Sequence, residues 1–294
     1  MKGNFSLIML GNLYIVATPI GNLGDMSNRA IEILKNVDMI AAEDTRNTGI
    51  LLDHFDIHTK MTSNHKFNEH QTVDRLISEL LAGKSIAVVS DAGTPCVNDP
   101  GFIVAESAAK AGINVIGIPG PCAAVTAISA SGLDAASFAF RGFFPREKKE
   151  IRDEFDLVEH RGSDLYIYYE SPKRIKDTIS AICDRFPEAQ LALCNDLTKI
   201  HERIYRGTPA SVLSMLNDNP NAEKGEYCLL MQYKAPETNE FEKDLLTPEA
   251  MLIDEIIKTG CTMKDAVASK AGTCKEYTKK EFYAASLRLK DMEL

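Results

Sequence analysis

The hydrophobic positions in the first half of the chain follow two alternating patterns. Short apolar runs with the length of buried strands lie at residues 13–18, 38–44, 85–90 and 114–119. Apolar side chains at helical spacing lie at residues 27–37, 70–83 and 102–111, and a further helix begins near residue 49. Alternation of this kind predicts a parallel sheet with helices on both faces.

The second half mixes the same two patterns in a less regular order. Strand patterns lie at residues 164–170, 189–198, 201–207 and 225–233, and helical patterns lie at 122–131, 171–186 and 208–218. Residues 131–150 read as a turn-rich, partly basic junction. This half therefore predicts a second, mixed α/β domain.

The ends of the chain have a different character. Residues 235–246 are polar, as expected of a linker, and three short helical patterns follow them. We therefore predict five segments. They are an N-terminal extension (1–12), a parallel α/β domain (13–122), a mixed α/β domain (123–234), the linker (235–246) and a small helical domain (247–294).

Composition narrows the function classes. The formal net charge of −9 argues against broad, nonspecific affinity for nucleic acids, which depends on many contacts from Lys and Arg to phosphates. Seven cysteines without a C-x-x-C pair argue against a disulfide framework or a thiolate zinc site, and they favour a cytoplasmic location. No apolar run reaches the ~18 residues that a membrane helix needs, so we expect no membrane association.

Four Gly- and Pro-rich loops follow the predicted strands of the first half. They are "TPIGNLGD" (18–25), "AAEDTR" (41–46), "SDAGTPCVNDPG" (90–101) and "PGPCAA" (119–124). Parallel sheets bind ligands at the carboxyl ends of their strands, so these loops predict a ligand site there. Asp91 begins the longest loop. Two roles are open for its carboxylate. It accepts hydrogen bonds from a ligand, or it caps the N–H groups of its own loop.

Other motifs carry less weight. The "AGKS" segment (82–85) lacks the first glycine of a P-loop and precedes a strand, and no G-x-G-x-x-G is present. Four histidines lie between residues 54 and 70. A metal site is one interpretation of them, but no companion cysteine or H-E-x-x-H pattern supports it. We favour solvated or RNA-facing histidines and expect no metal.

Seven ordered motifs carry a resemblance to a known family. They are "LYIVATPIGNLGD", "IAAEDTRNTGILL", "IAVVSDAGTPCVNDPG", "IPGPCAAVTAISASGL", "YYESPKRI", "LTKIHERIYRG" and "KGEYCLLM". Over residues 13–234 the chain resembles the tetrapyrrole methylase superfamily, and more closely the ribosomal RNA small subunit methyltransferase I family. The resemblance implies two α/β domains of tetrapyrrole-methylase type with the cofactor in the interdomain cleft, and a homodimer. It also implies S-adenosylmethionine-dependent methylation of a cytidine ribose 2′-hydroxyl in the decoding region of 16S rRNA, within the 30S subunit.

The resemblance also implies site residues. The cofactor pocket would take Asp91, Ala92, Gly93, Val97, Cys122, Ala123, Tyr169 and Leu229. The substrate-facing loops would present Asn22, Arg46 and Lys199, together with Glu43 and Asp44. The family usually has Arg-Glu before "LTK", where this chain has Asn195-Asp196, so the contacts around these two residues differ from the family pattern.

Methyl transfer to a ribose hydroxyl needs alignment and a proton acceptor. The candidate catalytic residues are Glu43, Asp44, Glu170 and Lys199. A local salt bridge is the competing interpretation of the Glu43-Asp44-Arg46 segment.

A basic cluster at Arg146, Lys148 and Lys149 is a candidate RNA contact, although interleaved acidic residues are equally typical of a solvated helix face. Two further functions stay open at this point. One is methylation of a small tetrapyrrole-like molecule, and the other is a noncatalytic role in binding the ribosome.

Overall fold

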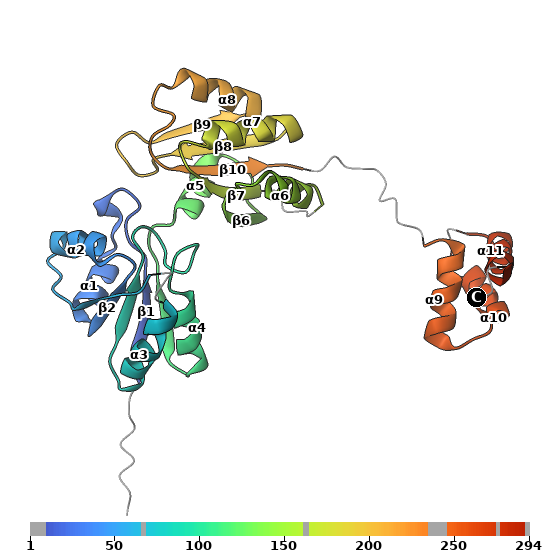
Figure 1. Cartoon of the computed structure of the whole chain (residues 1–294), viewed down its shortest axis with the longest axis horizontal. Helices are drawn as coiled ribbons and strands as arrows, with labels where there is room; N and C mark the ends of the chain where they lie inside the picture. The colour runs from blue at the N-terminus through green and yellow to red at the C-terminus, as the bar shows by residue number, and fades with distance from the viewer. Residues whose placement is uncertain (1–9, 66–68, 161–164, 235–245, 275–276, 292–294) are drawn as a thin grey trace, which may run out of the picture. The chain divides into compact units, whose positions relative to one another are not determined.

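The structure is a computed structural model that describes residues 10–65, 69–160, 165–234, 246–274 and 277–291 (Figure 1). Contacts along the chain divide it into two compact units, with the division after Lys234. The first unit holds two five-stranded sheets, and the second holds three helices. Most of the expected N-terminal extension (1–12) and almost all of the expected linker (235–246) lie outside the described residues.

The first sheet is entirely parallel and has the strand order β3-β2-β4-β1-β5. Its strands are β1 (Asn12–Val16), β2 (Met39–Ala42), β3 (Met61–Ser63), β4 (Ile86–Val89) and β5 (Asn114–Ile118). The sequence patterns predicted every one of them except β3. That strand has three half-buried residues at the edge of the sheet, too few to show a repeat.

Helices cover both faces of the first sheet, as the alternating pattern predicted. They are α1 (Asn28–Asn36), α2 (Thr45–His54), α3 (Glu69–Leu81) and α4 (Phe102–Lys110). One core cluster joins α1 and α2 to the sheet, and a separate cluster joins α3 and α4 to its other face. Helix α2 begins four residues before the expected start because the Asp44 side chain caps it.

The second sheet is mixed and has the order β6-β7-β10-β8-β9. Its strands are β6 (Phe138–Phe143), β7 (Leu165–Glu170), β8 (Gln190–Asn195), β9 (Arg203–Gly207) and β10 (Tyr227–Gln232). Only the β6–β7 pair is parallel. Helix α5 (Ala123–Ser131) packs on one face, while α6 (Lys148–His160), α7 (Ile175–Arg185) and α8 (Pro209–Asp218) pack on the other.

The prediction of a turn-rich junction at residues 131–150 was wrong, because this segment contains strand β6 and the start of helix α6. Strand β6 is hard to recognise because its register against β7 shifts between Phe140 and Phe143. Helix α6 carries many charged side chains, and only a narrow apolar stripe, including Phe155 and Val158, reaches the core. Helix α7 also starts at Ile175, four residues later than the pattern indicated, because residues 172–174 form a turn.

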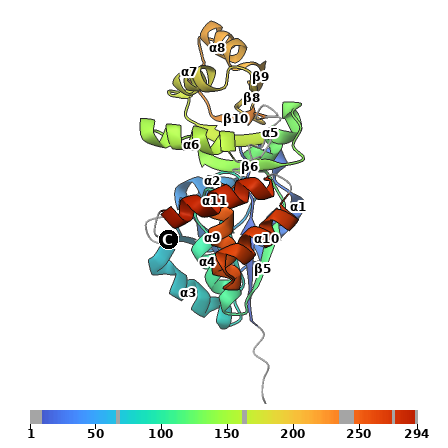
Figure 2. The same ribbon diagram turned by 90° about the vertical axis from the view of Figure 1, so that its right-hand side faces the viewer.

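The second unit confirms the three expected helices: α9 (Pro248–Thr259), α10 (Met263–Thr273) and α11 (Lys279–Asp291). The three helices pack against one another around a small core that includes Leu252, Val267 and Phe282 (Figures 1 and 2). Thr247 and Thr262 cap the first two helices by accepting a backbone hydrogen bond in the first turn. No helix in the described ranges combines the length and apolar character that a bilayer crossing requires.

Candidate functional site at the edge of the first sheet

The loops after β1, β2, β4 and β5 contact one another, as predicted. Thr18 and Gly93 exchange two backbone hydrogen bonds (2.8 and 3.0 Å). The Thr94 hydroxyl donates to the Pro121 carbonyl (3.0 Å), and the Asp44 N–H donates to the Asp91 carboxylate (3.1 Å). The carboxyl edge of the sheet is therefore a connected surface of four loops.

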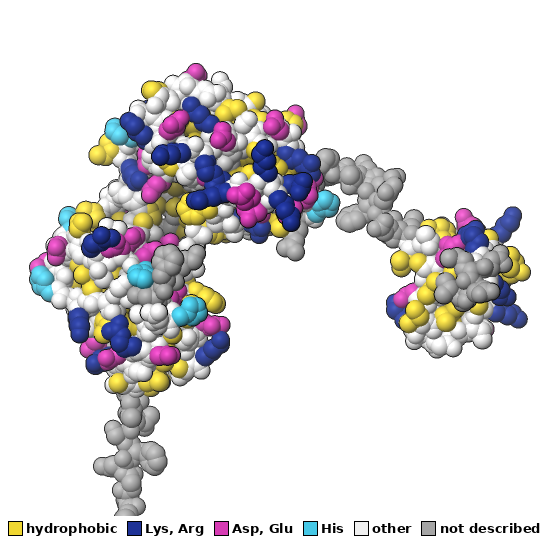
Figure 3. Space-filling model, viewed as in Figure 1, with side chains coloured by type: hydrophobic (Ala, Val, Ile, Leu, Met, Phe, Trp, Pro, Cys, Tyr) yellow, Lys and Arg dark blue, Asp and Glu magenta, His cyan; other side chains and the backbone are white. Residues whose placement is uncertain are grey.

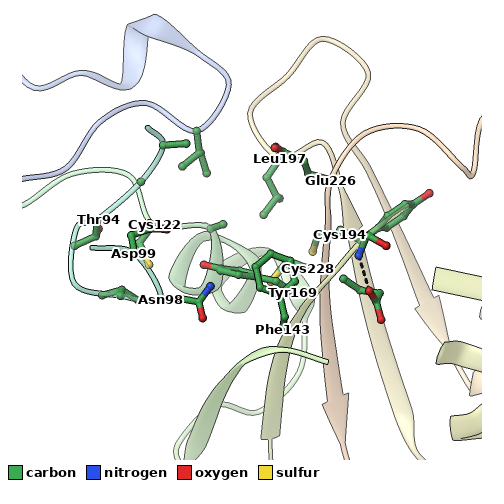
Figure 4. A pocket seen from close by; sticks show the side chains of 18 of the residues that line it. Thr94, Asn98, Asp99, Cys122, Phe143, Tyr169, Cys194, Leu197, Glu226 and Cys228 are labelled. Carbon is green, nitrogen blue, oxygen red and sulfur yellow. Dashed lines mark hydrogen bonds between the residues drawn. The ribbon is translucent and has the colours of Figure 1, made fainter. Parts of the chain in front are cut away.

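A cavity of about 380 Å³ opens beside these loops (Figure 4). Residues of the 90–101 loop form one wall, and residues of β7, β8 and β10 form the other. Cys122 and Ala123 at the start of α5 lie between the two walls. This volume lies within the range of roughly 300–1,000 Å³ that is typical of small-molecule sites.

Small residues let the backbone form part of the cavity wall. Gly93 has φ +84°, and an added Cβ atom would lie 3.4 Å from Ile20, so a larger residue there is strained. Ala92 and Ala123 also line the cavity with minimal side chains. Tyr169 and Phe143 supply an aromatic surface, with ring centroids 5.8 Å apart. A flat ring system can lie between such surfaces.

Most of the predicted cofactor residues line this cavity: Ala92, Gly93, Val97, Cys122, Ala123 and Tyr169. Leu229 does not. Its side chain packs in the core on the α7–α8 face of the sheet, and its neighbour Cys228 faces the cavity instead. Side chains alternate along a strand, so a shift of one residue reverses the face.

Asp91 also does not line the cavity, and its carboxylate instead binds residues at the start of α2. One oxygen accepts from the Asp44 N–H, and the other accepts from the Asn47 side-chain amide (2.9 Å). Both donors belong to residues at the start of α2 and not to the loop of Asp91 itself, so the expected capping of its own loop is not what the structure shows. The contacts join the β4–α4 loop to the start of α2.

Glu43 and Asp44 lie side by side in sequence but in different electrostatic surroundings. Burial raises the pKa of Glu43, and the negative charges of Asp91 and Asp44 raise it further. A hydrogen bond from the Asp91 N–H lowers this pKa but does not cancel the increase. Asp44 instead pairs with the exposed Arg46 side chain (2.6 Å), whose hydrogen bonds lower the pKa of Asp44 to about 2. Asp44 and Arg46 thus form the local salt bridge considered from the sequence, and Glu43 does not join it.

Glu170 is almost completely buried and has several partners. Its carboxylate accepts from the Ser171 N–H (2.6 Å) and the Thr178 hydroxyl (2.7 Å), and it pairs with Arg174 (3.1 Å). These contacts join the end of β7 to the first turns of α7. Glu170 borders the cavity, but its oxygens are already occupied.

Lys199 lies in the loop between β8 and β9. Its ammonium group donates to Asp196 (3.0 Å) and Glu226 (2.9 Å). Gly21 packs closely against it, because an added Cβ atom at Gly21 would lie 2.6 Å from the Lys199 side chain. Asn195 donates to the Glu226 carbonyl (3.4 Å), so the unusual Asn195-Asp196 pair holds the chain just before β10.

The predicted substrate residues lie outside the cavity lining. Asn22 caps a short 3₁₀ turn by accepting from the Gly24 N–H (3.0 Å). Arg146, Lys148 and Lys149 are exposed at the start of α6. Figure 3 shows Lys and Arg side chains over the α6–α7 surface, with Asp and Glu side chains among them. This arrangement keeps both interpretations of the basic cluster open.

Phe143 and Asp99 are among the cavity residues that were not predicted from the sequence. Phe143 was missed because its strand, β6, was read as a turn. Asp99 was given no role from the sequence, although it lines the cavity. The signal for Asp99 was its place in the same Gly- and Pro-rich loop as Gly93.

Within the described ranges, no group of three or more His, Cys, Asp or Glu side chains is arranged to hold a metal ion. Of the four histidines considered from the sequence, His58 pairs with Asp56 at the surface (2.9 Å).

Comparisons with known proteins place the chain among methylases. A family model described as "Tetrapyrrole (Corrin/Porphyrin) Methylases" matches residues 12–212. Three similar proteins bear the name "Ribosomal RNA small subunit methyltransferase I". The protein of Halalkalibacterium halodurans is 42% identical over 275 residues, which cover 93% of each chain. That of Escherichia coli O157:H7 is 41% identical, covering 84% of this chain and 86% of its own. The protein of Vibrio cholerae is 46% identical, and the match covers 74% of this chain and 76% of the Vibrio protein.

Two solved structures share the fold at low sequence identity. A diphthine synthase has a TM-score of 0.59 at 13% identity and covers 76% of this chain and 90% of its own. A uroporphyrin-III-C-methyltransferase from Thermus thermophilus has a TM-score of 0.52 at 20% identity. The match covers 76% of this chain and 94% of the methyltransferase. They confirm the predicted fold class.

Proposed function

The chain belongs to the tetrapyrrole methylase family, and within it to the ribosomal RNA small subunit methyltransferase I proteins, and we propose that it methylates a cytidine of 16S rRNA. The proposed acceptor is the ribose 2′-hydroxyl in the decoding region, and the proposed substrate is the assembled 30S subunit. The observation that carries the proposal is the identity of 41–46% to proteins named "Ribosomal RNA small subunit methyltransferase I".

The proposed methyl donor is S-adenosylmethionine, and the cavity has features that fit it. Gly93 and Ala123 allow a flat purine to approach the backbone, and Tyr169 offers an aromatic surface. When bound, this donor supplies a methyl group that is already activated by a positively charged sulfur. The chain therefore needs to align the acceptor hydroxyl and accept its proton, and the proposed reaction requires no metal.

Among the candidate proton acceptors we favour Glu43. Burial raises its pKa, which makes its carboxylate a stronger base than an ordinary glutamate. Asp44, with a pKa of about 2, is a weaker base, and Glu170 has no vacant oxygen. In the proposed reaction Glu43 would accept the proton of the ribose hydroxyl, and the donor, when bound, would supply the methyl group and keep the electrons of its carbon–sulfur bond.

The proposed RNA contacts are the exposed basic residues Arg46, Arg146, Lys148 and Lys149. A local patch of this kind is compatible with the negative net charge when the substrate is a structured particle. A cytoplasmic location, expected from the cysteine pattern, and a homodimer, expected from the resemblance, complete the proposal.

The test uses S-adenosylmethionine with a tritiated methyl group and three acceptors: 30S subunits, free 16S rRNA and porphyrinoid precursors. We expect label in the 30S subunit, and nuclease digestion should recover it in 2′-O-methylcytidine. Label in a porphyrinoid alone would favour a small-molecule methyltransferase. Absence of label in all three acceptors, with intact binding to the 30S subunit, would favour a noncatalytic ribosome-binding protein.

A further inference from the structure

Three carboxylates border the cavity, and they differ in their partners. Glu170 is held by Ser171, Thr178 and Arg174, and Glu226 pairs with Lys199. Within the described residues, no hydrogen bond or ion pair reaches the third carboxylate, that of Asp99. An unpaired carboxylate in a partly apolar cavity loses hydration without compensation, unless a ligand supplies a positive group.

The surroundings of Asp99 increase this cost. Burial raises the pKa of Asp99 to about 6, and the nearby charges of Glu43 and Asp91 contribute. Figure 4 shows Asp99 on the loop side of the cavity with Thr94 and Cys122, opposite Leu197 and Glu226. Burial is the main cause that raises the pKa of Tyr169 on the opposite wall, and the charge of Asp99 makes a small further contribution.

We propose that the Asp99 carboxylate is the counter-charge for the sulfonium group of the methyl donor, an inference that rests on the proposed function. In S-adenosylmethionine the ammonium and carboxylate groups of the amino acid part balance each other. The charge on sulfur has no partner within the donor. A cavity with one unpaired carboxylate matches a ligand with one unpaired positive charge.

This assignment predicts how the site treats donor and product. Methyl transfer removes the charge from sulfur, so S-adenosylhomocysteine lacks the group that Asp99 pairs with. The donor should therefore bind more tightly than the product, and the product should leave readily. Because Asp99 stabilises the charge before the reaction, its loss should weaken donor binding without lowering the turnover rate.

The proposal also predicts a pH dependence. The titratable groups that face Asp99 are Glu43 at the end of β2, Asp91 in its own loop, Cys96 beside it, and Tyr169 on β7. Protonation of Asp99 removes the counter-charge, so donor affinity should fall as the pH drops through about 6. An Asp99→Asn variant lacks this titration, so its donor affinity should depend less on pH in this range than that of the wild type.

The experiment measures binding of S-adenosylmethionine and S-adenosylhomocysteine to the full chain by calorimetry. We expect Asp99→Asn to weaken donor binding roughly 10- to 100-fold, as the loss of a charged partner does, and to change product binding by less than about threefold. Asp99→Glu should keep the preference for the donor. The matched control is Asp74→Asn, which removes one charge from an exposed position on α3.

The possible results distinguish a failure of the role proposed for Asp99 from a failure of the proposed function. Equal loss of both ligands, or no loss, in folded Asp99→Asn protein would overturn the role of Asp99 while leaving the proposed function intact. A lower turnover rate with unchanged donor affinity would also overturn it, because that result assigns Asp99 to proton transfer. If wild type bound neither ligand, the proposed function and this inference would both fail.

Discussion

The contacts of Glu170 predict that it stabilises the fold and takes no part in proton transfer. Its carboxylate is fully buried and joins the end of β7 to α7 through Ser171, Thr178 and Arg174. Glu170→Ala removes the acceptor and leaves the buried Thr178 hydroxyl and the Ser171 N–H without a partner. Arg174 keeps its hydrogen bonds to the Phe144 and Pro145 carbonyls, which limits the damage.

The expected size of this effect follows from the number of lost bonds. A hydrogen bond to a charged group contributes about 1.5–3 kcal/mol, so the loss of two predicts that Glu170→Ala destabilises the chain by about 3–6 kcal/mol. In Glu170→Gln the amide still accepts from Ser171, and the Thr178 hydroxyl can rotate to accept from the amide nitrogen. That variant should lose only about 1–2 kcal/mol, mainly from the Arg174 ion pair.

Urea unfolding followed by far-ultraviolet circular dichroism measures these values, since the chain contains no tryptophan for fluorescence. Glu106→Gln, which breaks an exposed ion pair with Lys110, is the control and should change stability by about 0–1 kcal/mol. Methylation is measured in parallel under conditions where each variant is folded. The reasoning fails if Glu170→Ala is as stable as the control. It also fails if folded Glu170→Gln loses about 100-fold or more in rate, which is the signature of a general base.

Three further predictions concern charged groups. Glu43→Gln should lower turnover by about 100-fold or more and leave S-adenosylhomocysteine binding unchanged, and the wild-type rate should fall as the pH drops through the raised pKa of Glu43. Charge reversal at Arg146, Lys148 and Lys149 should weaken binding to 30S subunits and flatten its salt dependence, with unchanged donor affinity measured by calorimetry. Burial raises the pKa of Glu154, but hydrogen bonds from the Arg141 guanidinium and the Tyr168 hydroxyl lower it by more. Glu154→Gln should therefore be less stable than wild type at neutral pH. That difference should shrink in urea unfolding experiments as the pH falls below the ordinary glutamate pKa of about 4.3 and then through the lowered pKa of native Glu154.

The fold was predictable wherever a segment repeats its pattern several times. Strands β1, β2, β4 and β5 are apolar runs between helices, and both the parallel sheet and the converging loops follow from them. Strand β3 was missed because it has only three residues, and β6 because Gly142 takes φ +72° where the register shifts. Such short or irregular strands depend on neighbouring strands for their hydrogen bonds, and a local pattern does not reveal those neighbours.

The position of the candidate site was more predictable than the role of each acid within it. Loop composition placed Asp44, Asp91 and Asp99 at one edge of the sheet, and the structure agrees. Their roles depend on partners at very different distances along the chain. The partner of Asp44 is Arg46, two residues away, and the sequence analysis considered that pair.

The partners of Asp91 lie 47 and 44 residues earlier, in a loop that only the sheet topology brings close. Asp99 is distinguished by the lack of a partner among the described residues, and no pattern in a sequence encodes that. An acid without a partner is costly in a folded protein unless a ligand compensates it. Composition therefore predicts where a ligand site lies, whereas the charge left unpaired in the cavity is the basis for our proposal of which part of the donor the chain would recognise.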